Sequence, residues 1–195
     1  MKLLIRFATV AAAVVALAAP ARAQQRSVIF SMYGGGADHL ADLQKNPSVW
    51  FMPGYDLGAS VGLQLNQYWA VHTDFTFTRN PTKGSGAFAG TNVNRYFYGA
   101  HLECRYPLSI GISPFVFGGL GAVSIDQLGV DQFKPFTRPA LMYGGGVFYG
   151  IPRSRVEVFC ELKGLTYRWN TAGYHRTMFD VTYSVGASYR LPVGF

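Results

Sequence analysis

Residues 179–195 read "FDVTYSVGASYRLPVGF" and close the chain. Every second residue from Phe179 to Phe195 is apolar or aromatic, whereas the residues between them are small or polar and include Asp180 and Arg190. This alternation is typical of a β-strand with two different faces, because successive side chains of a strand point to opposite sides. We therefore predict a final strand with one apolar face and one polar face.

The other end of the chain, "MKLLIRFATVAAAVVALAAPARA", has the layout of a secretory signal peptide. Lys2 and Arg6 give a positive start, residues 7–19 are apolar, and Ala21 and Ala23 flank Arg22 in a small-x-small cleavage signal. The apolar run is shorter than the roughly 20 residues that a membrane helix needs. We predict a signal peptide over residues 1–23 and a single domain over residues 24–195.

The predicted mature chain is poor in charge and mildly basic. It carries 14 basic and 10 acidic residues, without a Lys/Arg cluster that would indicate nucleic-acid binding. Charged residues make up 14% of the whole chain, against about 25% in ordinary soluble domains. No mature segment is a continuous apolar span, so the composition favours a β-barrel in lipid, whose strands need only one apolar face.

Alternating segments recur along the whole chain. We predict eight strands near residues 26–36, 54–66, 68–79, 92–106, 113–126, 136–150, 154–169 and 178–195. Short connections (66–68, 107–112, 151–154) alternate with longer ones (37–53, 80–91, 127–135, 170–177). This pattern predicts an all-β fold, an eight-stranded antiparallel up-and-down transmembrane β-barrel with short turns at one end and longer loops at the other.

The apolar face is predicted to point outward. A soluble eight-stranded barrel of the lipocalin kind also alternates, but its polar face would meet water. Here the polar face is largely Gly, Ser and Thr, which suits a narrow interior better than a solvent surface. In segment 154–169 the alternation changes phase after Gly164, so we predict a bulge there that turns Leu165, Tyr167 and Trp169 to the apolar outer face. Tyr167 and Trp169 would then belong to an aromatic girdle at the loop end.

Two glycine motifs, "YGGG" at residues 33–36 and 143–146, allow a functional and a structural interpretation. A phosphate-binding loop would need a GK[ST] or GxGxxG pattern and a following helix, which the sequence lacks. Glycine inside a barrel strand leaves space for a large side chain on the next strand. We favour the structural interpretation.

The inward face carries many charged side chains, which must pair because a barrel of eight strands is only wide enough for its own side chains. We predict a lumen charge network in a plugged barrel, with Glu157 paired to Arg190 on the adjacent strand. The expected network comprises His72, Asp74, His101, Glu103, Arg105, Arg138, Glu157, Glu161 and Arg190, and the same face carries Asp56, Arg95, Lys163 and Asp180.

The spacing of the histidines and cysteines in the sequence does not indicate a metal or cofactor site. His72 with Asp74, and His101 with Glu103, each share an inward face, so a carboxylate could orient an imidazole on the same strand. We favour the other interpretation, that these residues belong to a buried polar network that fills the lumen. Cys104 and Cys160 fall on the outer face of strands that are not neighbours, so both are expected to be free.

The signal peptide, the eight alternating strands and the C-terminal "YRLPVGF" resemble the OmpA-type outer-membrane β-barrel domain family of Gram-negative bacteria. Tyr189, Leu191, Val193 and Phe195 match the positions that carry the family's assembly signal, which the barrel-insertion machinery reads. Pro192 departs from that pattern, since proline removes a ladder donor. The resemblance implies a place in the outer membrane, with lipid and the barrel-assembly machinery as partners.

We expect a monomeric structural or surface-interaction barrel that is not an enzyme. Its external loops would make the contacts. Loop 37–53 is the candidate for an external partner because it is apolar, with Leu40, Val49, Trp50, Phe51 and Met52. One alternative is a narrow channel for small hydrophobic solutes. Another is a lipid-modifying outer-membrane enzyme, but the His-x-Ser pair that such deacylases carry does not occur in this sequence.

Overall fold

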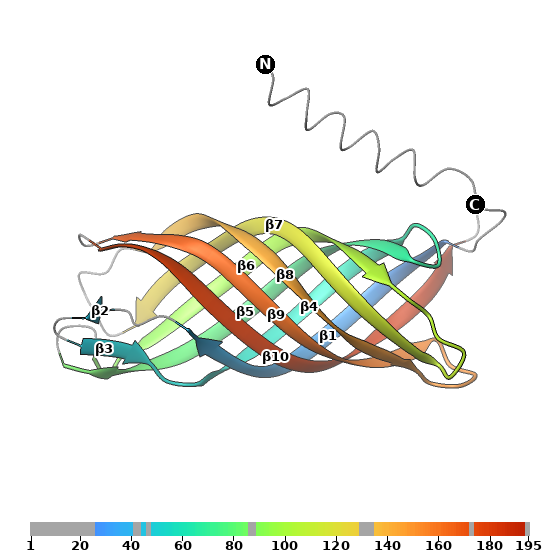
Figure 1. Cartoon of the computed structure of the whole chain (residues 1–195), viewed down its shortest axis with the longest axis horizontal. Coiled ribbons are helices and arrows are strands. Elements are labelled where there is room, and N and C mark those ends of the chain that lie inside the picture. The colour runs from blue at the N-terminus through green and yellow to red at the C-terminus, as the bar shows by residue number, and fades with distance from the viewer. Residues whose placement is uncertain are drawn as a thin grey trace, which may run out of the picture.

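The computed structural model describes residues 26–40, 44–45, 48–85, 89–128, 135–171 and 174–193. Eight long antiparallel strands close into a barrel (Figure 1). They are β1 (Arg26–His39), β4 (Gly54–Gln64), β5 (Trp69–Gly84), β6 (Asn92–Arg105), β7 (Ile112–Leu128), β8 (Phe136–Gly150), β9 (Val156–Thr171) and β10 (Tyr174–Val193). Two short strands, β2 (Gln44–Lys45) and β3 (Ser48–Phe51), extend the sheet at the end of β5.

The barrel is an up-and-down meander, which confirms the predicted fold. Each long strand pairs with the next along the chain, and β1 closes the circle by pairing with β10 from Arg26–Val193 to His39–Asp180. The strands have 11 to 20 residues, which is enough to cross a bilayer, because a tilted strand needs about 9–11. No helix among the described residues is long and apolar enough to span a membrane.

The predicted long connections are shorter than the sequence suggested. β1 continues to His39, and β3 pairs with β5 through Trp50 and Lys83, so much of the predicted loop 37–53 is strand. β9 and β10 pair as far as Thr171 and Tyr174, which shortens the predicted connection 170–177. Ladder hydrogen bonds satisfy the backbone polar groups there, so the strands continue after the apolar–polar alternation has faded.

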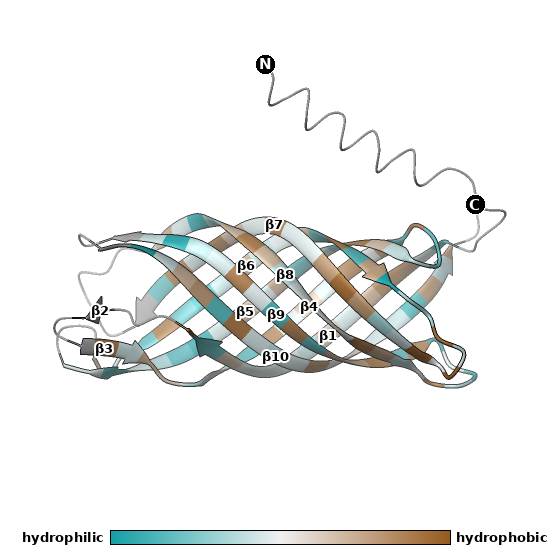
Figure 2. Cartoon of the chain, viewed as in Figure 1, coloured by the Kyte–Doolittle hydropathy of each residue, from teal (hydrophilic) through white to brown (hydrophobic). Residues whose placement is uncertain are grey.

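The two faces of the barrel are as predicted. Outward-facing apolar side chains are exposed, for example Met32 at 74%, Leu57 at 56% and Val185 at 68%, whereas the inward-facing Thr182 and Ser188 are each 1% exposed. In Figure 2 apolar and polar residues follow one another along the strands. This distribution places the apolar face where lipid would lie.

The predicted phase change in β9 is wrong. β9 pairs without interruption with both neighbours, and Gly164 lies directly opposite Tyr143 of β8 and Val181 of β10. The side chains after Gly164 therefore keep the inward direction of Lys163, and Leu165, Tyr167 and Trp169 are 3–5% exposed. Near the long loops the lumen side of β9 is therefore apolar, and these residues form no outer girdle.

Glycine residues of the strands leave space for aromatic rings, as the structural interpretation predicted. A Cβ on Gly58 would lie 2.2 Å from the ring of Tyr33, and one on Gly164 would lie 2.6 Å from the ring of Tyr143. The first ring fills the lumen and the second lies on the outer surface. Neither glycine has a positive φ, so close approach rather than backbone conformation explains them.

Both cysteines are free thiols, as predicted. Cys104 lies on β6 and Cys160 on β9, and these strands are not paired with each other. Cys160 is exposed on the outer face between two apolar neighbours, Val158 and Leu162, that are also exposed. It would therefore meet lipid if the barrel is inserted in a membrane.

Candidate functional site

The centre of the lumen holds a buried lysine from β9. The ammonium of Lys163 is fully buried and donates to the hydroxyl of Tyr33 at 2.8 Å and to the carboxylate of Asp74 at 3.2 and 3.3 Å. Thr76 accepts from it at 3.3 Å, and Glu161 forms an ion pair with it at 3.3 Å. Tyr33 and Thr76 in turn donate to Asp74, at 2.9 and 2.8 Å. The cluster thus joins β1, β5 and β9 across the barrel.

A second cluster lies toward the short turns. Arg105 donates through Nε and Nη2 to Oε1 of Glu103, at 3.1 and 2.9 Å, and through Nη1 to Glu157 at 2.8 Å. The same oxygen of Glu157 accepts from Arg190 at 2.9 Å, so the predicted Glu157–Arg190 pair forms. Ser188 of β10 lies directly opposite Glu157, and Arg190 follows it by two residues. The side chains of Glu157 and Arg190 therefore meet diagonally across the two strands.

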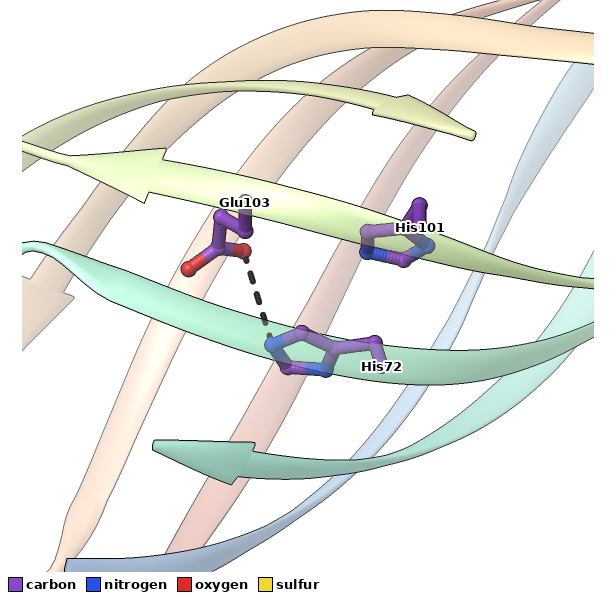
Figure 3. Close-up of side chains that lie close together, drawn as sticks. All are labelled: His72, His101 and Glu103. Atoms are coloured by element: carbon purple, nitrogen blue, oxygen red, sulfur yellow. Dashed lines mark ion pairs between the residues drawn. The ribbon is translucent and has the colours of Figure 1, made fainter. Parts of the chain in front are cut away.

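Between these clusters lie two histidines and a glutamate (Figure 3). His72 on β5 is directly opposite His101 on β6, and their rings stack with centroids 5.0 Å apart and planes 7° from parallel. Glu103 lies 3.9 Å from His72 across the strands rather than against His101 on its own strand. Asp74 contacts Lys163 instead of His72. The same-strand His–carboxylate pairs, which were not the favoured interpretation of the sequence, do not form, because the cross-strand register decides the contacts.

A third cluster lies near the long loops, and its histidine falls outside the predicted network. Arg95 donates to Thr78 at 3.2 Å and to Asn80, and it lies 3.7 Å from Asp180. His39 contacts both Arg95 and Asp180. The sequence placed His39 in a loop, so only the extension of β1 beyond its alternating segment could have revealed it.

Arg138 occupies the inward position predicted for it, near the loop end of β8. Its guanidinium carbon lies 5.0 Å from the ring centroid of Phe136, and Nη1 donates to the carbonyl of Thr137 at 3.2 Å. Asp56, also on the inward face, accepts from Ser184 of β10 at 2.7 Å. Inward polar groups thus lie along the whole length of the barrel.

Inward-facing side chains are buried at several levels of the described barrel. Ser188 near the turns, Thr76 and Lys163 at the centre, and Asn80 and Val93 near the loops are all 0–1% exposed. The described part of the chain therefore has a lumen whose charges meet partners within a packed interior, as expected of a narrow barrel.

Three of the four residues of the predicted assembly signal lie in the described part of β10. Tyr189 and Leu191 are each 43% exposed on the outer face, and Val193 pairs with Arg26 of β1. Strand pairing continues through Pro192, which lies opposite Ser27. Phe195 lies outside the described residues.

Comparison with known proteins gives the family. A model of the outer membrane protein beta-barrel domain matches residues 9–195. The chain belongs to this family. A comparison of the sequence with curated proteins finds no significant match.

Solved structures of outer-membrane barrels share the fold at low sequence identity. Neisserial surface protein A is 16% identical with a TM-score of 0.59, and the alignment covers 86% of this chain and 98% of that one. The attachment invasion locus protein Ail of Yersinia pestis is 19% identical with a TM-score of 0.52, over 86% and 99% of the two chains. OprG of Pseudomonas aeruginosa is 11% identical with a TM-score of 0.58, over 87% and 97%. These likenesses show the fold alone.

Proposed function

We propose that this chain is an outer-membrane barrel with a plugged lumen and a structural or surface-interaction role carried by its external loops. The observation that carries this proposal is the packed interior, with an ion-paired Lys163 that is 0% exposed at its centre. A barrel with a packed lumen is suited to holding its external loops in place rather than to conducting water and ions. Neisserial surface protein A and the attachment protein Ail have the same fold, which supports a role at the cell surface.

The location is tested by expressing the chain in a Gram-negative host and fractionating the membranes. We expect the protein in the outer-membrane fraction, with a mobility shift between boiled and unboiled gel samples. A soluble periplasmic protein without a shift would contradict the proposal. The plugged lumen is tested in planar bilayers, where the purified barrel should give no stable conductance steps, and regular steps would overturn that part of the proposal.

We also propose that the barrel-assembly machinery recognises the C-terminal strand and inserts the barrel into outer-membrane lipid. The exposed Tyr189 and Leu191 alternate with inward-facing polar residues, which supports this proposal. Deleting Phe195 should lower the folded outer-membrane fraction, whereas conservative replacement by Tyr should not. Sedimentation of the detergent-solubilised protein should give the mass of a monomer.

The external partner proposal rests on apolar side chains at the loop end. Leu40, Trp50 and Met52 are 72%, 41% and 41% exposed, and β3 holds Trp50 beside the end of β5. Replacing the three residues by serine should reduce binding of expressing cells to immobilised surface proteins and glycans. The matched control replaces Leu108 and Ile110, exposed at the opposite end of the barrel. Equal binding by both variants would count against the loop.

The second candidate is a narrow channel for small hydrophobic solutes. It is favoured by the buried apolar side chains that β7, β8 and β9 contribute to the lumen, which are Val123, Ile125, Met142, Leu165 and Trp169. A channel of this kind would require these packed side chains to move apart. Faster uptake of a hydrophobic fluorescent solute by expressing cells, lost when Met142 is replaced by Trp, would support it over the structural role.

Enzyme activity is not part of the proposal. His72, His101 and Glu103 are buried in the lumen, whereas an enzyme acting on membrane lipid needs its nucleophile and base on the lipid side. Incubating the reconstituted barrel with outer-membrane lipid and analysing the acyl chains by mass spectrometry tests this expectation. Altered lipids would contradict it.

A further inference from the structure

We propose that His72, His101 and Glu103 form a buried binding site for one divalent transition-metal ion of the zinc class. Two imidazoles and a carboxylate are the ligands that such ions take in proteins, with a fourth position left to water. One donor atom from each of the three residues lies within 4.8 Å of the other two. Figure 3 shows the three side chains gathered from β5 and β6 in one part of the lumen.

The backbone fixes this arrangement. His72 and His101 are direct partners in the β5–β6 ladder, and Glu103 follows His101 by two residues, so all three share the inward face. A Cβ on Gly62 would lie 2.4 Å from the ring of His72, so this glycine makes room for the imidazole on the neighbouring strand. Phe117 packs against His101 from the other side, with ring centroids 4.9 Å apart.

The donor atoms are available for a ligand. The side chains of His72 and His101 are both more than nine-tenths buried. Nε2 of His72 and Nδ1 of His101 nevertheless have no hydrogen-bond partner. Such nitrogens are unfavourable inside a protein unless something binds them. Glu103 uses Oε1 for Arg105, and its Oε2 lies 3.9 Å from Nε2 of His72.

The distances require only a local adjustment. Zinc–nitrogen bonds of about 2.0–2.1 Å place two ligands of one tetrahedral ion about 3.3 Å apart. The donors must therefore close by up to about 1.5 Å, which rotation of the side chains allows. Arg105 holds the glutamate in place from behind, as outer partners of metal ligands commonly do, and Glu157 offsets the charge of that arginine at 2.8 Å.

A small hollow lies at the end with the short turns, and Glu103 and Arg105 are among the residues that line it. The other lining residues are Ile29 of β1 and residues of the segment 64–70. Of the three proposed ligands, Glu103 is the one that lines this hollow.

The test uses the folded, tag-free barrel in detergent after treatment with EDTA. Isothermal titration with Zn²⁺ should give one ion per barrel, and each of His72→Gln, His101→Gln and Glu103→Gln should weaken binding at least tenfold. His39→Gln is the matched control, because it changes a buried histidine of the loop-end cluster and should leave binding unchanged. Folding of every variant is checked by its gel mobility shift.

Two results would overturn the proposal. One is no stoichiometric Zn²⁺ binding by the wild-type barrel, and the other is binding that survives the double substitution of both histidines. If the variants do not fold, X-ray absorption of the wild-type complex decides. A zinc spectrum with two imidazole nitrogens supports the site, and a spectrum without imidazole refutes it.

Discussion

Removing the lysine at the centre of the lumen should destabilise the barrel more than removing its main partner. Lys163 lies 3.2 Å from Asp74 and 3.3 Å from Glu161, so it is the cation between two carboxylates. At an effective dielectric constant of about 20, each such pair attracts by about 5 kcal/mol before desolvation is subtracted. Lys163→Met removes both attractions and leaves two buried carboxylates without their cation.

Asp74→Asn has a smaller effect, because Lys163 keeps Glu161 as a counter-charge. The amide of Asn can still accept from Tyr33, so the loss is close to that of charged hydrogen bonds, about 1–3 kcal/mol. Breaking a buried pair so that charge remains unpaired costs about 3–5 kcal/mol. With a urea dependence of about 2 kcal/mol per molar, Lys163→Met should lower the unfolding midpoint by about 2 M and Asp74→Asn by about 1 M.

The assay is urea unfolding of barrels folded into lipid vesicles, followed by tryptophan fluorescence and by gel mobility. The double variant should be destabilised by at least about 1 kcal/mol less than the sum of the single variants, because they share one interaction. Lys163→Leu with Asp74→Leu gives a further comparison, since an apolar replacement of the whole pair is often neutral. Equal effects of the two single variants, or simple additivity, would refute the ion-pair reasoning.

Two other predictions follow from the packing. Gly58→Ala should lower the free energy of unfolding by about 1–3 kcal/mol, because its Cβ would lie 2.2 Å from the ring of Tyr33. Gly118→Ala is the control, since nothing lies within 4 Å of its Cβ, and it should change the same free energy by less than about 0.5 kcal/mol. Cys160 should react with a membrane-soluble maleimide in the folded barrel, and replacing Cys104 and Cys160 by serine should leave the gel mobility unchanged with and without reductant. A reductant-dependent shift would contradict the prediction of free thiols.

The alternation of apolar and polar residues predicted the barrel and the direction of most side chains. It succeeds because a residue that faces lipid must be apolar, so Leu57 and Val185 can be assigned from sequence alone. It could not predict which inward side chains contact each other, because the β5–β6 register brings His72 and His101 together. It also could not predict where the strands end. Residues 80–91 were expected to be a connection, but β5 runs to Gly84 and its pairing with β6 extends to Pro81.

The error at Gly164 has a physical cause. The rule that one face is apolar constrains the side that meets lipid, but it sets no polarity for a lumen from which water is excluded. Leu165, Tyr167 and Trp169 are stable inside because Met178 and other apolar side chains from facing strands cover them. In a filled barrel both faces of a strand can therefore be apolar. Only an unbroken register with both neighbours, as β9 has, decides which residues point inward.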